Sequence, residues 1–121
     1  MREVDLKDRT KEFAKRIIEI CRNLPENRDG RLIGNQLFRS STSIGANYRS
    51  ACRAKSLADF IAKLSIVEEE TDETLYWLEL LDELKIVPHK IIKPIHDEAN
   101  EILAIIVSSI KTSRKRKNKT Q

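Results

Sequence analysis

The chain has 121 residues, of which 35% are charged and 5% aromatic, with three Gly and three Pro. This length provides one hydrophobic core, and so few turn-forming residues exclude a β-sandwich or β-barrel with many tight turns. The chain has no apolar run near the roughly 20 residues of a membrane span, and its charged N-terminus lacks the apolar stretch of a secretory signal.

Charge is distributed unevenly along the chain. Residues 1–67 carry 14 Lys and Arg against 8 Asp and Glu, residues 68–103 carry 3 against 11, and residues 104–121 carry 6 against none. A basic first half, an acidic middle and a basic end predict either pairing between helices or two surfaces of opposite charge.

The first amphipathic segment ends near Pro25. Apolar side chains recur in it every three or four positions, as on a helix face that packs against a bundle. They are Leu6, Thr10, Phe13, Ile17, Ile20 and Leu24. Pro25 and the polar residues 26–30 predict the end of this helix.

The second segment, residues 31–53, carries two stripes on opposite faces of a helix. The stripe that we expect to face the core consists of Ile33, Leu37, Ser41, Ile44, Tyr48 and Ala51. The opposite stripe includes the four residues that we call the arginine stripe: Arg31, Arg39, Arg49 and Arg53. Small residues such as Gly45 and Ala46 in the middle of this helix favour the close approach of another helix.

The third segment opens at Ser56 and Asp59, which have the form of a helix-capping box, and Val87 and Pro88 end it. Its core seam is Leu57, Phe60, Leu64, Val67, Thr71, Thr74, Leu78 and Leu81. Its far end carries more apolar side chains than one core face requires, which favours a homo-oligomer over a wholly internal explanation. The candidate oligomer interface is Leu75, Tyr76, Trp77, Leu80 and Leu84.

A fourth helix starts at either Pro88 or Pro94. Its core positions are Ile95, Ala99, Ile102, Ile106 and Ile110. Four helices with short connections predict an all-α fold, an antiparallel up-down four-helix bundle. We expect the bundle to span residues 1–112 and residues 113–121 to form a basic, disordered tail.

The sequence lacks the residue patterns that catalysis or metal binding requires. A di-iron site requires a Glu three residues before a His, and neither His89 nor His96 has one, so the acidic run 68–73 does not predict such a site. No nucleophilic side chain has a His beside it in the sequence. We therefore expect no enzyme, metal or cofactor. Cys21 and Cys52 lie among apolar neighbours, which favours reduced core thiols and a cytoplasmic protein.

Two basic segments are candidates for contact with nucleic-acid phosphates. One is the arginine stripe, whose alternative role is to pair with the acidic run 68–73. The other is the C-terminal tail, whose alternative role is only to solubilise, with the candidates Lys111, Arg114, Lys115, Arg116 and Lys117. Neither segment has aromatic residues that could stack on bases, so backbone or shape recognition is the expected mode.

Residues 36–47, Gln-Leu-Phe-Arg-Ser-Ser-Thr-Ser-Ile-Gly-Ala-Asn, resemble the signature of a bacterial protein family. Its members are four-helix bundles encoded by intervening sequences in the 23S ribosomal RNA gene. The likeness continues through residues 58–69 and spans residues 5–112. The sequence departs at residues 48–51, where Tyr-Arg-Ser-Ala stands in place of the Ile-Ala-Glu-Gly of many members, so no role of that Glu carries over.

The resemblance implies an antiparallel bundle that assembles into a ring-shaped homopentamer. A relative of similar fold, the accessory variability protein of diversity-generating retroelements, binds nucleic acid and a reverse transcriptase through basic surfaces. We therefore expect non-enzymatic nucleic-acid binding, with RNA favoured. The alternative is a scaffold that recruits a different protein through the apolar surface of the third helix.

Overall fold

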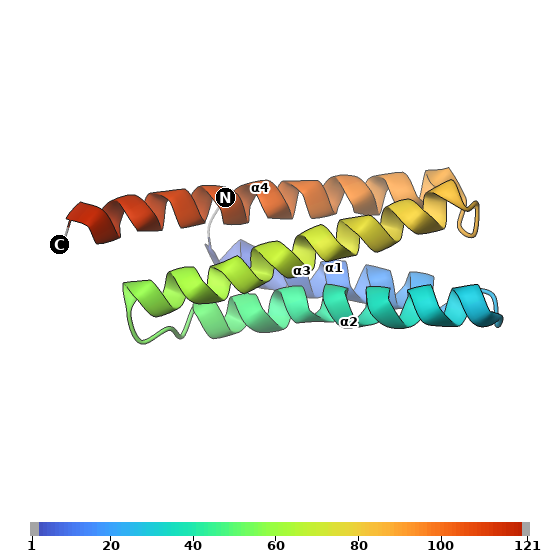
Figure 1. The fold of residues 1–121 in the computed structure, drawn as a ribbon, viewed down its shortest axis with the longest axis horizontal. Helices are drawn as coiled ribbons and strands as arrows, with labels where there is room; N and C mark the ends of the chain where they lie inside the picture. Colours follow the sequence, from blue (N-terminus) through green and yellow to red (C-terminus); the bar gives the residue numbers. More distant parts are fainter. Residues whose placement is uncertain (1–2, 120–121) are drawn as a thin grey trace.

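The computed structural model describes residues 3–119, which form four helices and no strand (Figure 1). These are α1 (Glu3–Arg22), α2 (Arg28–Ala51), α3 (Leu57–Glu83) and α4 (His89–Lys119). The predicted all-α fold is therefore confirmed over this range. Residues 1–2 and 120–121 of the predicted bundle and tail lie outside the described residues.

Each helix packs against its neighbours in the chain, and α4 also contacts α1. Between the described residues, no Cα atom of α1 lies within 8 Å of one in α3, and none of α2 lies within 8 Å of one in α4, so these pairs lie at opposite corners of the bundle. The α1–α2 and α3–α4 connections share one end of the molecule (Figure 1). The α2–α3 connection lies at the other end, together with the last residues of α4.

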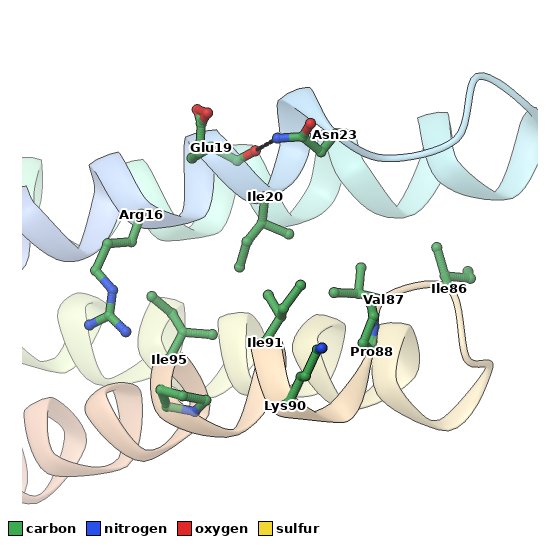
Figure 2. A pocket seen from close by; sticks show the side chains of 11 residues that line it. Arg16, Glu19, Ile20, Asn23, Ile86, Val87, Pro88, Lys90, Ile91 and Ile95 are labelled. Carbon is green, nitrogen blue, oxygen red and sulfur yellow. Dashed lines mark hydrogen bonds between the residues drawn. The ribbon is translucent and has the colours of Figure 1, made fainter.

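A groove of about 500 Å³ separates α1 from α4 near the α3–α4 connection (Figure 2). Ile20 reaches into it from α1, and Ile91 and Ile95 reach into it from α4. We call it the apolar groove. Arg16 and Lys90 also line it.

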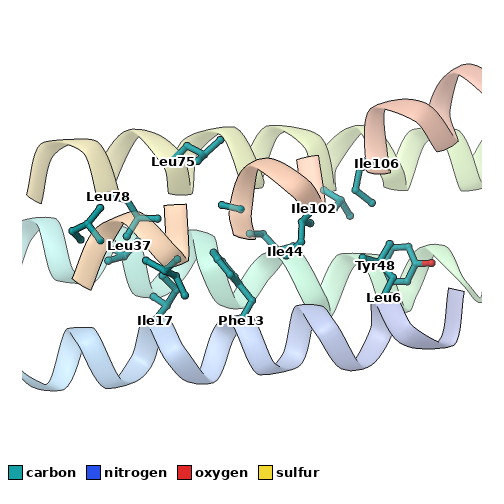
Figure 3. Packing of buried hydrophobic residues seen from close by; sticks show 14 of the residues in the cluster. Leu6, Phe13, Ile17, Leu37, Ile44, Tyr48, Leu75, Leu78, Ile102 and Ile106 are labelled. Carbon is teal, nitrogen blue, oxygen red and sulfur yellow. The ribbon is translucent and has the colours of Figure 1, made fainter. Parts of the chain in front are cut away.

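Apolar side chains from all four helices meet along the bundle axis (Figure 3). The largest side chains with less than 2% exposure are Phe13, Ile17, Leu37, Ile44, Leu64, Val67, Leu78, Leu81, Ile92, Ile95, Ile102 and Ile106. Nearly all belong to the seams predicted from the sequence. Burying each one stabilises the fold by about 1.5–3 kcal/mol, so this core is the main source of stability.

Hydroxyl groups occupy several core positions. Thr10, Ser40, Ser41, Thr71 and Thr74 are all fully buried. Thr74 Oγ1 donates to Ser40 Oγ at 2.8 Å and so joins α3 to α2, while Thr71 Oγ1 donates to the Val67 carbonyl at 2.7 Å. Every buried side-chain nitrogen or oxygen among the described residues has a hydrogen-bond partner. These small polar residues therefore allow close packing without the penalty of unpaired groups.

Side-chain caps fix where α2 and α3 begin. Asn27 Oδ1 accepts from Gly30 N at 2.9 Å, and Ser56 Oγ accepts from Asp59 N at 3.0 Å. The second of these confirms the predicted cap. Asp59 does not complete a capping box on Ser56, because its carboxylate accepts from Lys55 N instead, at 3.2 Å.

The α3–α4 connection starts earlier than the sequence predicts. Lys85 adopts a left-handed conformation with φ of 57°, and the next amide, Ile86 N, donates back to the Leu81 carbonyl at 2.9 Å. This is a common way to end a helix, and α3 stops at Glu83. Helix α4 then begins directly after Pro88 and runs through Pro94.

The end of α4 differs from the sequence-based expectation. The helix continues to Lys119, so residues 113–119 are helical and not a disordered tail. Ser113 is only 4% exposed and extends the four- and three-residue spacing of Ile106 and Ile110. The core seam therefore runs past residue 112. The sequence pattern did not indicate this, because Ser113 is small and polar, yet it packs against the bundle.

The candidate oligomer interface on α3 does not form one surface. Leu75 is 6% exposed and belongs to the core of the single chain. Trp77 is half-buried against the core and donates from Nε1 to Glu73 at 3.1 Å. Tyr76 and Leu84, each 56% exposed, point outward. Part of the apolar excess thus has an internal explanation, since α3 packs against both α2 and α4.

Candidate nucleic-acid interface

A groove of about 510 Å³ lies between the first half of α1 and the last half of α2. Lys7 and Lys11 line it from α1, while Arg49 and the nearby Arg53 line it from the other side. We call it the basic groove. Asp8 is its one acidic lining residue among those that the structure describes.

Small residues form the remaining lining of the basic groove: Thr10, Ala14, Thr42, Gly45 and Ala46. A Cβ atom on Gly45 would lie 3.2 Å from Thr10 Oγ1, which is tighter than an ordinary contact. Helix α1 therefore approaches α2 closely at this glycine, as the small residues predict. No long side chain stands between the cations among these lining residues.

The four cations of the basic groove are exposed. No acidic side chain in the described part of the chain forms an ion pair with any of them. On each wall the two cations are four residues apart in sequence, and on α1 this spacing is about 6 Å along the helix, so like charges repel. A polyanion relieves this repulsion, and no aromatic residue lines the groove for base stacking. The arrangement therefore suits phosphate groups.

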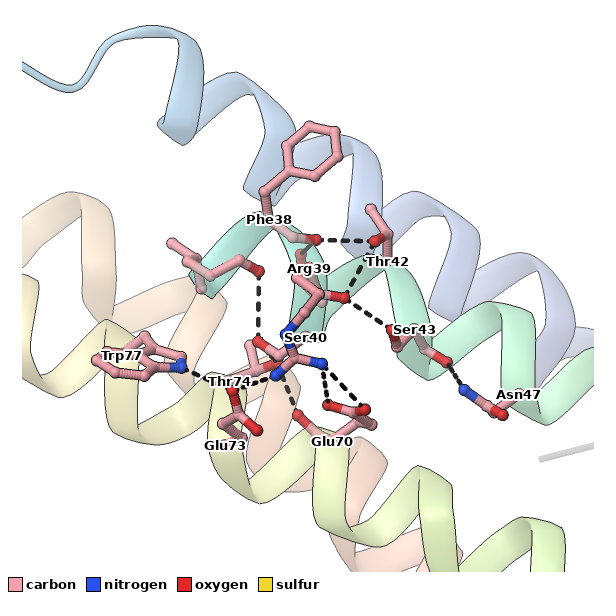
Figure 4. A network of polar contacts seen from close by, with 12 residues as sticks. Phe38, Arg39, Ser40, Thr42, Ser43, Asn47, Glu70, Glu73, Thr74 and Trp77 are labelled. Carbon is pink, nitrogen blue, oxygen red and sulfur yellow. Dashed lines mark hydrogen bonds and ion pairs between the residues drawn. The ribbon is translucent and has the colours of Figure 1, made fainter. Parts of the chain in front are cut away.

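Arg39 turns away from the basic groove and toward α3 (Figure 4). Its guanidinium donates to Glu70, with Nη1 3.2 Å from Oε2, and pairs with Glu73. This is the alternative role that the sequence offered for the stripe, pairing with the acidic run. The hydrogen bonds that Trp77 and then Arg39 donate to Glu73 lower the pKa of Glu73, and the hydrogen bond that Arg39 donates to Glu73 raises the pKa of Arg39.

Arg31 lies apart from the other members of the arginine stripe. It lines a separate hollow near the α1–α2 connection, together with Cys21, Leu24 and Phe38. The structure thus divides the stripe into three parts and brings only Arg49 and Arg53 together. At about 100° per residue, Arg31, Arg39 and Arg49 spread over about 80° of arc around α2. Long side chains on one stripe can therefore still reach different neighbours.

The end of α4 supplies further cations at the same end of the bundle as the α2–α3 connection (Figure 1). Lys111, Arg114 and Lys115 are exposed, and so is Arg116. Lys117 is half-buried. The last residues of α2 that line the basic groove lead directly into that connection, so two basic segments far apart in sequence lie at one end of the molecule.

The other polar clusters are weaker candidates for a functional site. His89 Nδ1 lies 2.8 Å from Asp82 Oδ2, and His96 Nε2 lies 2.9 Å from Glu79 Oε2, as links between α3 and α4. The described residues contain no group of three or more His, Cys, Asp or Glu that could hold a metal ion. Burial raises the pKa of the Cys21 thiol to about 11, which makes this residue a poor nucleophile.

A family model described as 23S rRNA-intervening sequence protein matches residues 2–108. The chain belongs to this family. A crystal structure of a protein of unknown function from the S23 ribosomal protein family of Bacteroides thetaiotaomicron is 40% identical, with a TM-score of 0.85. The match covers 92% of this chain and 99% of that one. No curated protein matches the chain.

In this member of the 23S rRNA-intervening sequence protein family, the signature residues 36–47 are mainly structural. Ser40 meets Thr74 of α3 on one side, and Gly45 meets Thr10 of α1 on the other. The segment that resembles the family signature is therefore where α2 packs against both neighbours. Among the helices that the structure describes, none is long and apolar enough to span a membrane.

Sequence reasoning missed Lys7 and Lys11, which form the α1 wall of the basic groove. They lie four residues apart and beside Thr10, whose neighbours in the fold were not known from the sequence. The available signal was that spacing together with the small residues of the facing helix. It becomes informative only once α1 is known to lie beside Gly45.

Proposed function

We propose that this protein binds nucleic acid, with RNA favoured, through the basic groove and without catalysing a reaction. The observation that carries the proposal is the pair of facing cation rows, Lys7 and Lys11 opposite Arg49 and Arg53, without acidic partners in the described chain. Ribosomal RNA in the family's description supports RNA as the favoured class.

The proposed mode of binding is contact with the phosphate backbone. Lys and Arg that neutralise phosphates release condensed counterions, which gives an affinity that depends steeply on salt and little on sequence. The exposed cations at the end of α4, such as Arg114 and Lys115, extend the same basic end and provide a second contact.

Self-association is part of the proposal. The resemblance stated above implies a ring-shaped homopentamer of antiparallel bundles, and several identical basic grooves on one assembly would bind one RNA with avidity. Free Cys21 and Cys52 suit a reducing compartment, and we place the protein in the bacterial cytoplasm.

The test is RNA binding measured by fluorescence anisotropy with a structured RNA between 50 and 200 mM salt. We expect R49Q/R53Q to weaken binding and to reduce the salt dependence, because each lost phosphate contact lowers the slope of log K against log salt by about 1. The matched control is R28Q/R31Q, which removes the same charge from the opposite end of α2.

Equal affinity of R49Q/R53Q and the control variant would remove the basic groove as the site. No RNA or DNA binding by the intact protein at 50 mM salt would remove the function. The alternative, a scaffold that recruits a different protein, would then be favoured by the outward apolar side chains of α3, Tyr76 and Leu84.

A further inference from the structure

The contact between α1 and α4 changes along its length. Toward the start of α1, Arg9 donates to both carboxylate oxygens of Glu98, at 2.6 and 2.7 Å, and lies 3.1 Å from Glu101. These ion pairs hold the two helices together there. In the described chain, no hydrogen bond or ion pair joins residues 16–23 to residues 86–95. The apolar groove occupies this second stretch.

Apolar side chains form most of the apolar groove. Ile20 reaches into it from α1, Ile91 and Ile95 reach into it from α4, and Val87 and Pro88 line its end at the α3–α4 connection (Figure 2). Ile95 is buried, whereas Ile91 is 46% exposed. The groove thus has a buried apolar floor and an accessible rim. Its volume of about 500 Å³ lies within the roughly 300–1,000 Å³ of small-molecule sites.

The charged side chains that face the apolar groove are positive. Arg16 and Lys90 line it from opposite helices, and both are exposed. Neither has an acidic partner among the described residues. Glu19 also lines the groove, but its carboxylate lies 3.8 Å from Arg22 and points away from α4 (Figure 2). The apolar groove therefore offers two unpaired cations beside an apolar surface.

This combination of groups is complementary to an amphipathic acid. A wholly apolar ligand would leave the cations to water, and a compact polyanion would leave the apolar floor in contact with water. A carboxylate accepts two parallel hydrogen bonds from a guanidinium, and each methylene group that the groove removes from water adds affinity. A ligand with an apolar body and one carboxylate uses both properties of the groove.

The length of the apolar groove indicates the size of the ligand. Residues 88–95 line it along α4 and extend about 10 Å at 1.5 Å per residue. An extended carbon chain advances about 1.2 Å per bond, so about eight or nine bonds cover this length. Arg16 stands at the end of the groove that lies toward Arg9, and Lys90 lies near the other end (Figure 2). A medium-chain acyl group therefore fits between them.

We infer that the apolar groove binds a medium-chain fatty acid, with its carboxylate at Arg16 and its acyl chain along Ile20 and Ile91. The chain ends near Pro88, where the aliphatic part of Lys90 covers it while the ammonium group stays in water. This site lies between α1 and α4, whereas the basic groove lies between α1 and α2, so the inference does not depend on RNA binding.

The test measures binding of decanoate to the full chain by isothermal titration calorimetry at about pH 7, below the concentration at which decanoate forms micelles. Decanol, which has the same chain length and no charge, tests the role of the cations. R16Q removes the carboxylate partner, with R28Q on α2 as its matched control. I91D places a charge in the apolar groove, with L32D as its control, since Leu32 is 60% exposed and lies outside the groove. Circular dichroism checks that each variant keeps its helices.

We expect decanoate to bind more tightly than octanoate by up to about sixteenfold, since each buried methylene contributes up to about fourfold. Dodecanoate should gain little more, because its last carbons extend past the groove. Decanol binding to the unchanged chain and decanoate binding to R16Q should each be about three- to fivefold weaker, as for an exposed ion pair. I91D should lose measurable binding, while R28Q and L32D should bind as the unchanged chain does.

Several outcomes would overturn the inference. Equal affinities for decanoate and decanol would show that the cations do not select the ligand, and decanoate binding that persists in I91D would place the site elsewhere. An affinity that rises as steeply from decanoate to dodecanoate would indicate a general apolar surface. Binding to vesicles of anionic phospholipid without binding to free decanoate would assign this surface to a membrane. RNA binding remains separately tested by R49Q/R53Q under each of these results.

Discussion

At the scale of single residues, Gly45 sets how closely α1 and α2 approach. A Cβ at this position would already meet Thr10 Oγ1 at 3.2 Å. We expect G45L to lower the urea midpoint, because the cost of overpacking, about 1–3 kcal/mol, outweighs the gain of about 1 kcal/mol from replacing Gly in a helix. A46L is the matched control at an exposed neighbour. Equal midpoints for G45L and the unchanged protein would mean that α1 can move away from α2 without cost.

The contacts of Glu73 predict a pH dependence. Hydrogen bonds from Trp77 and Arg39 hold the pKa of its carboxyl below the ordinary value of 4.5. A folded-state pKa below the unfolded one means that ionised Glu73 stabilises the fold above pH 4.5. This stabilisation is lost as the pH falls through the lower value.

Replacing Arg39 should therefore raise the pKa of Glu73 toward its ordinary value, although the bond from Trp77 keeps it lowered in part. NMR titration of the Glu73 carboxyl carbon in R39Q measures this shift directly. R31Q is the control, because Arg31 lies in a different hollow. An unchanged Glu73 titration in R39Q would show that the ion pair does not persist in solution.

At the scale of helices, α2 does two things with one stretch of sequence. Its buried residues, such as Leu37 and Ile44, complete the core, while its small residues admit α1 and leave the floor of the basic groove open. The same small residues that fix the packing therefore expose the cations on either side. This arrangement explains why a segment with poor helix formers is nevertheless a continuous helix, because tertiary contacts outweigh propensity.

Helix α4 carries a prediction of its own, because its last residues are ordered in the helix and exposed at the basic end. We expect R114Q/K115Q to weaken RNA binding and to lower the salt slope by up to about 2, while helicity stays the same, since Gln is a good helix former. Anisotropy titrations against R28Q/R31Q compare equal losses of charge. If both double variants bind alike, the end of α4 contributes only through net charge.

At the scale of the whole molecule, the fold places the basic and acidic segments of the sequence on different parts of the bundle. The last residues of α2 that line the basic groove and the basic end of α4 lie at one end of the molecule (Figure 1). The acidic run on α3 is partly paired with Arg39, through Glu70 and Glu73.

Much of the fold could be predicted from the sequence, and less of the site. The seams of the helices, the cap at Ser56 and the small-residue contact at Gly45 are all local patterns with one physical solution. The arginine stripe was predicted as one surface, but Arg39 and Arg49 have different neighbours. A stripe specifies a direction on one helix, and long side chains take partners from whichever helix lies within reach.

The sequence by itself determined four amphipathic helices and their buried faces, because hydrophobic periodicity depends only on residues within a few turns of each other. The tertiary structure alone decided that Lys7 and Lys11 face Arg49 and Arg53, that Arg39 pairs with α3, and that Leu75 is internal. Each of these depends on which helix lies beside which and at what level along the axis. That arrangement results from the packing of all four helices together, and no local pattern encodes it.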